Sequence, residues 1–219
     1  MRRFCYRIVF SVYHRRIITN YLRCYKIRKL QIGSGANVLE GWLNTDLNPR
    51  KKTVSLDATK RFNFDDNTFD YVFMEHLIEH LTFEQGLVLL KECYRVLKFR
   101  GRIRISTPNL HFVISLYEKD RSSAQEKYIQ WVMETVLPRI RVFSSVFVIN
   151  NFFSCWGHKF LYDDETLTLL LAHCGFVKVK RYAVKESDDG NLRNIEVHGW
   201  SVGEEFNVLE SMVLEAEKG

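Results

Sequence analysis

Apolar residues recur in short runs that are separated by turn residues along most of the chain. Five of these runs have the length and composition of β-strands: residues 29–32, 43–47, 53–56, 69–74 and 102–106. Between the last two runs, residues 83–97 place apolar side chains at helical spacing, namely Leu87, Leu90, Tyr94 and Leu97. Strands that alternate with a helix in this way predict parallel β–α–β units.

The pattern continues towards the C-terminus with one more helix and two more strands. Asp163 or Asp164 is expected to cap a helix that runs to Cys174 and stops at Gly175. Residues 176–182 alternate like a strand, and residues 212–216 form an apolar run that is suited to a last strand. Residues 111–160 are rich in aromatic side chains but show no regular period.

The N-terminal 28 residues differ from the rest in charge. Apolar positions in residues 4–25 follow helical spacing and arginines fill the others, which predicts a basic amphipathic arm over residues 1–28. Nine of the 32 Lys and Arg residues lie in residues 1–29, where no acid occurs, so the remaining 23 face 26 acidic residues. Such an arm either contacts an anionic membrane surface as a peripheral anchor or packs against the domain. The acidic body argues against a nucleic-acid partner.

The number and spacing of the cysteines and the hydropathy of the chain indicate the expected cellular compartment. The five cysteines are odd in number and none has CxxC spacing, so neither a disulfide framework nor a structural zinc site is expected. A reducing compartment, the cytoplasm, is the expected location. No apolar run is long enough to predict a transmembrane span, and no signal-peptide pattern precedes residue 29. The sequence does not indicate an oligomeric state.

Small and acidic residues follow three successive strands. Gly33-Ser34-Gly35 comes directly after the first strand, where glycine lets backbone N–H groups approach a ligand closely. Asp46 ends the second strand, and a carboxylate there can bind both hydroxyls of a ribose. Asp57 follows the third strand, where its alternative role is a turn cap. Because parallel strands end at one edge of a sheet, the three signals together predict a nucleotide-type site.

Longer motifs make the chain similar to a known family. The segments that carry the similarity are 30–35 (LQIGSG), 41–47 (GWLNTDL), 69–81 (FDYVFMEHLIEHL), 92–98 (ECYRVLK), 101–109 (GRIRISTPN) and 158–163 (HKFLYD). In combination they resemble the class I S-adenosylmethionine-dependent methyltransferases, over residues 29–219. More narrowly, they resemble small predicted methyltransferases associated with polysaccharide and glycosyl-transfer genes. A departure is the link Lys98-Phe99-Arg100-Gly101 before the fifth strand, where the family usually has Lys-Pro-Gly-Gly.

The resemblance implies a fold, a cofactor and a set of site residues. The implied fold is an α/β, Rossmann-like, doubly wound sheet of seven mostly parallel strands with an antiparallel last strand, here preceded by the basic arm. The implied cofactor is S-adenosyl-L-methionine. The residues that would hold it are Gly33, Ser34, Gly35, Asp46, Leu47, Asp57, Ala58, Met74, Glu75 and His76. Residues 111–160 would form the cover on the acceptor side.

Two other chemistries fit parts of the same motifs. His76-Leu77-Ile78-Glu79-His80 has the H-x-x-E-H spacing of a zinc-protease helix, but the strand before it and the methyltransferase motifs explain it without a metal. A dinucleotide oxidoreductase would need a third glycine at position 38, where the chain has valine. No metal is therefore expected, although metal dependence stays open.

The reaction expected from the resemblance is an in-line methyl transfer, for which alignment of the reacting atoms supplies much of the acceleration. A hydroxyl acceptor would also need a base of near-neutral pKa, and the histidines nearest the expected methyl group are His80 and then His158. The expected acceptor is a saccharide or a glycosylated small molecule. The alternatives are a lipid-linked acceptor near a membrane, or a catalytically silent cofactor-binding module.

Overall fold

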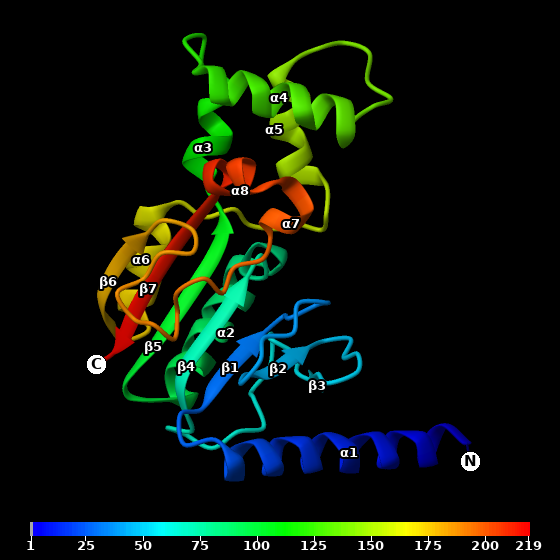
Figure 1. The fold of residues 1–219 in the computed structure, drawn as a ribbon, viewed down its shortest axis with the longest axis vertical. Coiled ribbons are helices and arrows are strands. Elements are labelled where there is room, and N and C mark those ends of the chain that lie inside the picture. Colours follow the sequence, from blue (N-terminus) through cyan, green and yellow to red (C-terminus); the bar gives the residue numbers. More distant parts are fainter. Residues whose placement is uncertain (1) are drawn as a thin grey trace.

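The centre of the molecule is a seven-stranded mixed β-sheet (Figure 1). The computed structural model describes residues 2–219, with side chains from Tyr13 onward. The sheet order is β3-β2-β1-β4-β5-β7-β6, and β7 is antiparallel to both of its neighbours while β1 to β5 run parallel. The strands are β1 Lys29–Ile32, β2 Leu43–Asp46, β3 Val54–Ser55, β4 Phe69–Glu75, β5 Leu97–Pro108, β6 Phe176–Tyr182 and β7 Ser211–Lys218. The fold class predicted from the sequence is confirmed.

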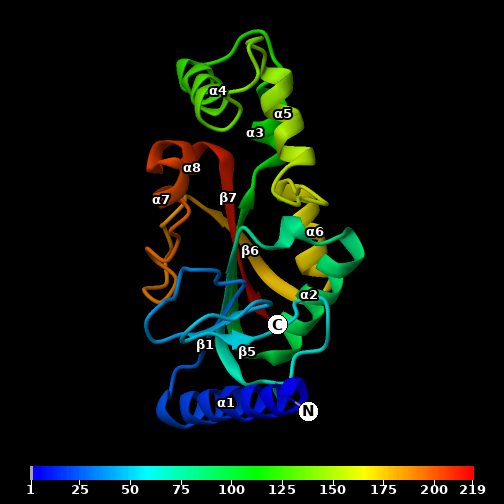
Figure 2. The same cartoon turned by 90° about the vertical axis from the view of Figure 1, so that its right-hand side faces the viewer.

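Helices α2 (Phe83–Val96) and α6 (Asp164–His173) cover one face of the sheet (Figure 2). A capping box of Thr82 and Gln85 begins α2, and the Asp163 carboxylate caps α6 by accepting the Thr166 N–H at 2.8 Å. The apolar sides of both helices bury the main core against β1, β4 and β5. These two helices stand where the sequence periodicity predicts them.

The opposite face of the sheet is covered by irregular chain. Residues 183–198 form neither helix nor strand, and they fold over β4 and the segment that leads into β2. A small apolar cluster joins them to the sheet: Trp42, Phe73, Leu192 and Ile195. The connection from β1 to β2 contains no helix, as the few residues between Gly35 and β2 predict.

A helical cap stands over the carboxyl ends of β4 and β5 (Figure 1). It contains α3 (Leu110–Ser115), α4 (Ser123–Thr135) and α5 (Ser145–Ser154), with α7 (Gly199–Val202) and α8 (Glu204–Glu210) beside them. Their aromatic and aliphatic side chains form a second core, separate from the main one. The helices in residues 111–160 could not be predicted from periodicity, because the aromatic residues there lack a single repeating face.

Helix α1 (Arg2–Cys24) lies at the opposite end of the molecule from this cap. The hydroxyl of Tyr21 is bonded to the carbonyl oxygens of Lys29 and Gly41, at 2.9 and 3.0 Å, and lies 2.8 Å from the Lys29 N–H. Ile17, Ile18 and Leu22 pack against the main core. From Tyr13 onward, the arm therefore packs on the domain and leaves basic side chains in water, among them Arg15, Arg16 and Arg23.

Membrane spans and disulfides complete the description. None of the helices within residues 2–219 combines the length and the apolar character that crossing a bilayer requires. Cys24, Cys93, Cys155 and Cys174 are all free thiols, and Cys5 lies outside the described side chains. Contact of residues 1–28 with a membrane surface stays a prediction.

Candidate functional site

Residues 33–35, here called the glycine loop, turn sharply after β1. Gly33 has φ +70° and Gly35 has φ +53°, values that glycine adopts without the strain of a side chain. The Ser34 N–H donates to the Thr45 carbonyl at 2.9 Å, and the Gly35 N–H donates to Asp46 Oδ2 at 2.9 Å. The structure therefore brings the loop and Asp46 together as predicted. The other oxygen of Asp46 accepts the Asn48 N–H at 2.8 Å.

Asp57 lies one strand further along the same edge but has its own partners. The Leu56 N–H donates to the Asp46 carbonyl at 3.0 Å, which places the end of β3 beside Asp46. The Asp57 carboxylate accepts from the Thr59 N–H and hydroxyl and pairs with Lys60 at 2.8 Å. These bonds, the one from Lys60 above all, lower the pKa of Asp57 to about 2. The side chain thus caps a turn, which is the alternative that the sequence left open.

The neighbours of these acids differ in exposure. Leu47 is exposed, while Ala58 is half-buried against the main core. Asp57 also lines a cavity of about 410 Å³ between α1 and residues 54–64, where His14 and Ile18 form the opposite wall. Among the described residues, no hydrogen bond joins the Asp57 side chain to the glycine loop, so their common role in cofactor binding stays a prediction.

The turn that follows β4 contacts the glycine loop. A Cβ atom added to Gly33 would lie 2.8 Å from Leu77 Cδ1, so the Leu77 side chain packs directly on that glycine. Met74, the last apolar residue of β4, is fully buried in the main core. His76 begins the turn with φ +46°, a left-handed conformation that is uncommon for a residue with a side chain. This turn redirects the chain from the sheet edge into η1 (Ile78–His80).

Glu75 is engaged by the irregular segment that covers the sheet. Its carboxylate accepts the N–H groups of Val197 and His198 at 3.0 and 2.9 Å, and burial raises the pKa of Glu75. The His76 ring stacks on the His198 ring with centroids 3.7 Å apart. Glu75 and His76 therefore hold residues 197–198 in place, and His76 faces a second cavity instead of the glycine loop.

This second cavity, here called the histidine cavity, has a volume of about 340 Å³. It lies between η1, the end of β5 and the helical cap. Its polar lining is His76, Glu79, His80, His158, His198, Ser201 and Glu210, and aromatic rings form much of the remainder: Tyr128, Trp131, Phe152 and Trp156. Concave sites of this size, with a few converging polar groups in an apolar lining, are typical of small-molecule binding.

Glu79 is the buried acid at the inner end of the histidine cavity. Its Oε2 accepts the Thr107 hydroxyl at 2.9 Å, and its Oε1 lies 3.3 Å from His76 Nδ1. Burial opposes charge on both side chains, but their mutual attraction outweighs it. The pKa of Glu79 is therefore lowered, and the pKa of His76 is raised.

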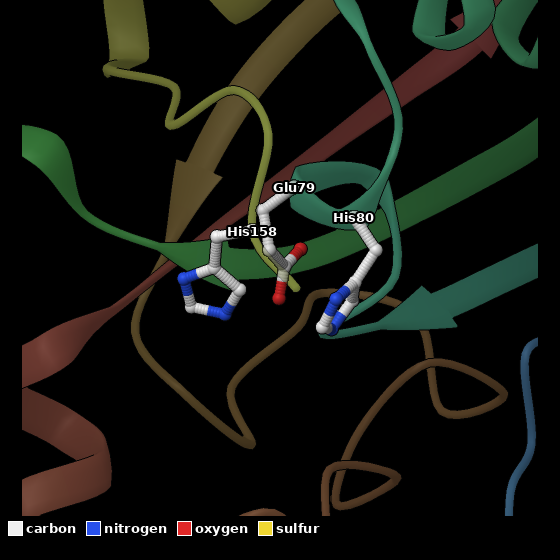
Figure 3. Close-up of side chains that lie close together, drawn as sticks. All are labelled: Glu79, His80 and His158. Carbon is white, nitrogen blue, oxygen red and sulfur yellow. The ribbon is translucent and has the colours of Figure 1, made fainter. Parts of the chain in front are cut away.

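His80 and His158, the two predicted bases, lie next to each other at this end of the cavity. Their rings meet edge to face with centroids 5.0 Å apart. His158 Nδ1 lies 2.7 Å from the Phe152 carbonyl oxygen, which can only accept, so Nδ1 carries the proton. Burial lowers the pKa of His158, which favours the neutral ring. Figure 3 shows both rings turned towards the Glu79 carboxylate.

Three further side chains of this cavity, Tyr128, His198 and Glu210, form a group that the sequence does not predict. Glu210, at the end of α8, accepts a hydrogen bond from the Tyr128 hydroxyl and lies 2.8 Å from His198 Nε2. Nothing in the sequence connects His198 to Glu210 or Tyr128. These residues belong to three different segments, and no short motif contains them.

Comparison with known proteins shows what this chain is similar to. Residues 31–105 match a family model described as a methyltransferase domain. The match covers about a third of the chain, from β1 into β5. A search of curated proteins gave no match. The matched residues include the glycine loop, Asp46 and the turn after β4.

Solved structures show the same fold as this chain. One is an S-adenosylmethionine-dependent methyltransferase from Archaeoglobus fulgidus, with 20% identity, a TM-score of 0.51, and coverage of 95% of this chain and 94% of that one. Another is an S-adenosylmethionine-dependent methyltransferase from Mesorhizobium loti, with 13% identity, a TM-score of 0.52, and coverage of 88% and 91%. These likenesses show the fold that the sequence predicts.

Proposed function

We propose that this protein transfers the methyl group of S-adenosylmethionine to a hydroxyl oxygen of a saccharide or a glycosylated small molecule. The observation that carries the proposal is the turn after β4. It touches the glycine loop through Leu77 and lines the histidine cavity through His76, Glu79 and His80. A cofactor held at the glycine loop would therefore lie across this single turn from an acceptor held in the cavity.

The cofactor half of the proposal rests on the glycine loop and Asp46. The loop presents backbone close to the sheet edge, and the Asp46 carboxylate is half-buried there with lone pairs left beyond its two backbone bonds. A ribose diol can donate to such a carboxylate in charge-assisted hydrogen bonds. These residues would hold the cofactor by its adenosyl part and direct its methyl group towards the turn.

The acceptor half rests on the lining of the histidine cavity. Its aromatic walls offer flat apolar faces, while the imidazoles at its inner end can accept the proton of a hydroxyl. In the step itself, the acceptor oxygen forms a bond to the methyl carbon as the carbon–sulfur bond breaks. The bonding electrons pass to sulfur, S-adenosylhomocysteine leaves, and the hydroxyl proton passes to the imidazole end of the cavity.

Preference for a saccharide is supported by the resemblance to methyltransferases associated with glycosyl-transfer genes. The walls also suit it, since they include Trp131, which is half-buried, Trp156, which is exposed, and the buried Phe152, whose ring meets that of Trp156. Such a lining binds a ring with one apolar face and polar edges. It would serve a glycosylated aglycone equally well.

The test is methyl transfer from S-adenosylmethionine labelled in its methyl group. The full chain is incubated with nucleotide sugars, free oligosaccharides, glycosylated phenols and, for contrast, simple amines. We expect label in a base-stable ether on a sugar hydroxyl, and a rate reduced by about 10²–10⁴-fold in His80→Ala and His158→Ala. His173→Ala, an exposed histidine on α6, is the matched control and should retain full rate.

Other outcomes separate the alternatives. Label on the amines alone would refute O-methylation while leaving the methyltransferase activity in place. Binding of S-adenosylhomocysteine without transfer to any acceptor of the panel would contradict the proposal and favour a cofactor-binding module.

A further inference from the structure

Three side chains at the inner end of the histidine cavity are arranged like the ligands of a metal ion. Glu79, His80 and His158 each offer one ligand atom, and the three atoms lie within 4.8 Å of one another. Figure 3 shows the Glu79 carboxylate between the two imidazole rings. Glu79 and His80 come from η1, while His158 comes from the loop that follows α5.

Backbone hydrogen bonds fix these two segments to each other. The Glu79 carbonyl accepts the N–H groups of Lys159 and Phe160, at 2.7 and 3.2 Å. The loop that carries His158 is thus tied to the very residue that carries the carboxylate. A ligand set from distant parts of the chain is useful only if the segments are held together, and these bonds hold them.

The Glu79 carboxylate has an oxygen that the protein does not satisfy. The side chain is fully buried, and Oε2 accepts the Thr107 hydroxyl. Oε1 has no hydrogen bond within the part of the chain that the structure describes, although His76 Nδ1 lies 3.3 Å away. A buried carboxylate oxygen without a donor is costly, so its presence points to a cation that binds there.

The two imidazoles are set up as ligands in different ways. His158 donates from Nδ1 to the Phe152 carbonyl, so its Nε2 carries a free lone pair. Metal-bound histidines are typically oriented by such a bond from the second ring nitrogen. His80 makes no hydrogen bond from its ring to any described residue; its one ring contact is with His158. Both rings are half-buried and reach the cavity, where a substrate can meet the ion.

We propose that Glu79, His80 and His158 bind one divalent transition-metal ion at the inner end of the histidine cavity. Two imidazoles and one carboxylate suit zinc, manganese, iron or cobalt, whereas magnesium and calcium prefer oxygen ligands. Bonds to such ions are about 2.0–2.2 Å long, so the ligand atoms close in by about 1 Å through side-chain rotation when the ion binds. The remaining coordination positions face the open cavity.

In the proposed O-methylation, the ion would activate the acceptor hydroxyl. This role rests on the proposed function. A hydroxyl bound to the metal loses its proton far more readily than a free one, because the positive charge stabilises the oxyanion. The proton goes to water in the open cavity, and the oxygen then forms its bond to the methyl carbon as the carbon–sulfur bond breaks. With the ion bound, His80 and His158 act as its ligands, and water takes over the role of proton acceptor that the imidazoles have without a metal.

Direct titration of the metal tests the site without relying on activity. The full chain is stripped with a chelator and titrated by calorimetry with zinc chloride, and with cobalt chloride while visible absorption is recorded. We expect one equivalent to bind, with the absorption of cobalt in a nitrogen- and oxygen-ligand site. Glu79→Gln and His158→Ala should each weaken binding at least about tenfold, and His173→Ala should not change it.

The variants are checked for fold before they are interpreted. Circular dichroism and binding of S-adenosylhomocysteine at the glycine loop must match the unaltered chain. Glu79→Gln keeps the size of the side chain and its contact with Thr107. Absence of one-equivalent binding in the unaltered chain, or equal binding in both ligand variants, would overturn the proposal.

Activity then separates this inference from the proposed function. Methyl transfer that persists in the chelated chain and does not rise on addition of zinc, manganese or cobalt would remove the metal and leave O-methylation intact. One-equivalent binding in a chain that methylates no saccharide would keep the metal site and remove the proposed function.

Discussion

The glycine loop and the histidine cavity lie on two sides of one turn, yet they are built differently. The glycine loop and Asp46 are close in sequence and are joined by backbone N–H groups, such as that of Gly35. The histidine cavity draws its lining from five separate stretches, around residues 76–80, 108, 128–136, 152–158 and 198–210. Its polar groups bond mainly to one another through side chains.

This difference sets what a mutation does at each place. Around the glycine loop, the polar groups are near water, so a lost bond can be replaced by solvent and the fold survives. Around the histidine cavity and the segment that supports it, the charges are buried, so a lost partner leaves an unpaired charge inside the protein. Substitutions at the first place should affect cofactor affinity, whereas removal of one partner of a buried charge pair at the second should affect stability.

The largest effect is expected from Arg104, a fully buried residue of β5. It pairs with Glu196 and with Glu215, at 2.5 Å for the latter, and donates to the Glu186 carbonyl at 2.7 Å. Arg104→Met leaves two buried carboxylates without their cation and frees the segment that positions His198. We expect the free energy of unfolding to fall by about 3–5 kcal/mol, measured by urea denaturation.

Arg102 on the same strand is the matched control for Arg104. Its guanidinium pairs with Asp188 at 2.7 Å, where the two side chains are 31% and 53% exposed. Arg102→Met should cost at most about 1 kcal/mol, as expected for a pair in contact with water. Equal losses for the two variants would contradict the distinction between buried and exposed charges. The folded fraction of Arg104→Met should still bind S-adenosylhomocysteine.

Much of the sheet was predictable because its signals are local. Residues 29–32 and 176–182 are the bounds of β1 and β6 themselves, and the capped helices α2 and α6 begin where capping residues stand. β5 is longer than predicted, since it begins at Leu97, directly after α2. Arg100 and Gly101 are typical turn residues and predict a strand that begins after them, but β5 continues through both.

Only the part of the candidate site whose residues are close in sequence, the glycine loop with Asp46, was predictable. Gly33 and Asp46 follow strands whose order the sequence implies, so their meeting could be inferred. The pairing of His198 with Glu210 and Tyr128 could not, because it depends on α7, α8 and α4 packing together. The H-x-x-E-H motif was recognised, but its third partner, His158, becomes a metal ligand only through the fold. Nothing in the sequence connects His158 to Glu79.

A smaller effect is expected at Asp46, where the substitution should change cofactor affinity and leave the stability of the fold almost unchanged. Asp46→Ala removes the carboxylate that accepts the Gly35 N–H and that we expect to hold the ribose. Binding of S-adenosylhomocysteine, measured by calorimetry, should weaken by about 1.5–3 kcal/mol, while urea denaturation should change little. Asp120→Ala, which changes an exposed acid away from the glycine loop, is the control. Unchanged affinity in a folded Asp46→Ala variant would remove this residue from the site.

The smallest effect is expected at Asp57, where the acid caps a turn at the edge of the sheet. Its folded pKa is about 2 and its ordinary value is 3.8, so the carboxylate stabilises the fold fully above about pH 4. That contribution is lost as the pH falls towards 2. Asp57 and Lys60 are 29% and 75% exposed, so solvent screening limits the loss in Asp57→Asn to at most about 1 kcal/mol at pH 7.

Urea denaturation between pH 7 and pH 2 checks this expectation. The difference between Asp57→Asn and the unaltered chain should be constant down to about pH 4 and should then shrink. Asp120→Asn should show no such pH-dependent difference. Affinity for S-adenosylhomocysteine distinguishes the two roles of Asp57, because a turn cap predicts a smaller loss than that of Asp46→Ala. A loss as large as that at Asp46 would show that Asp57 leaves Lys60 and Thr59 to bind the cofactor.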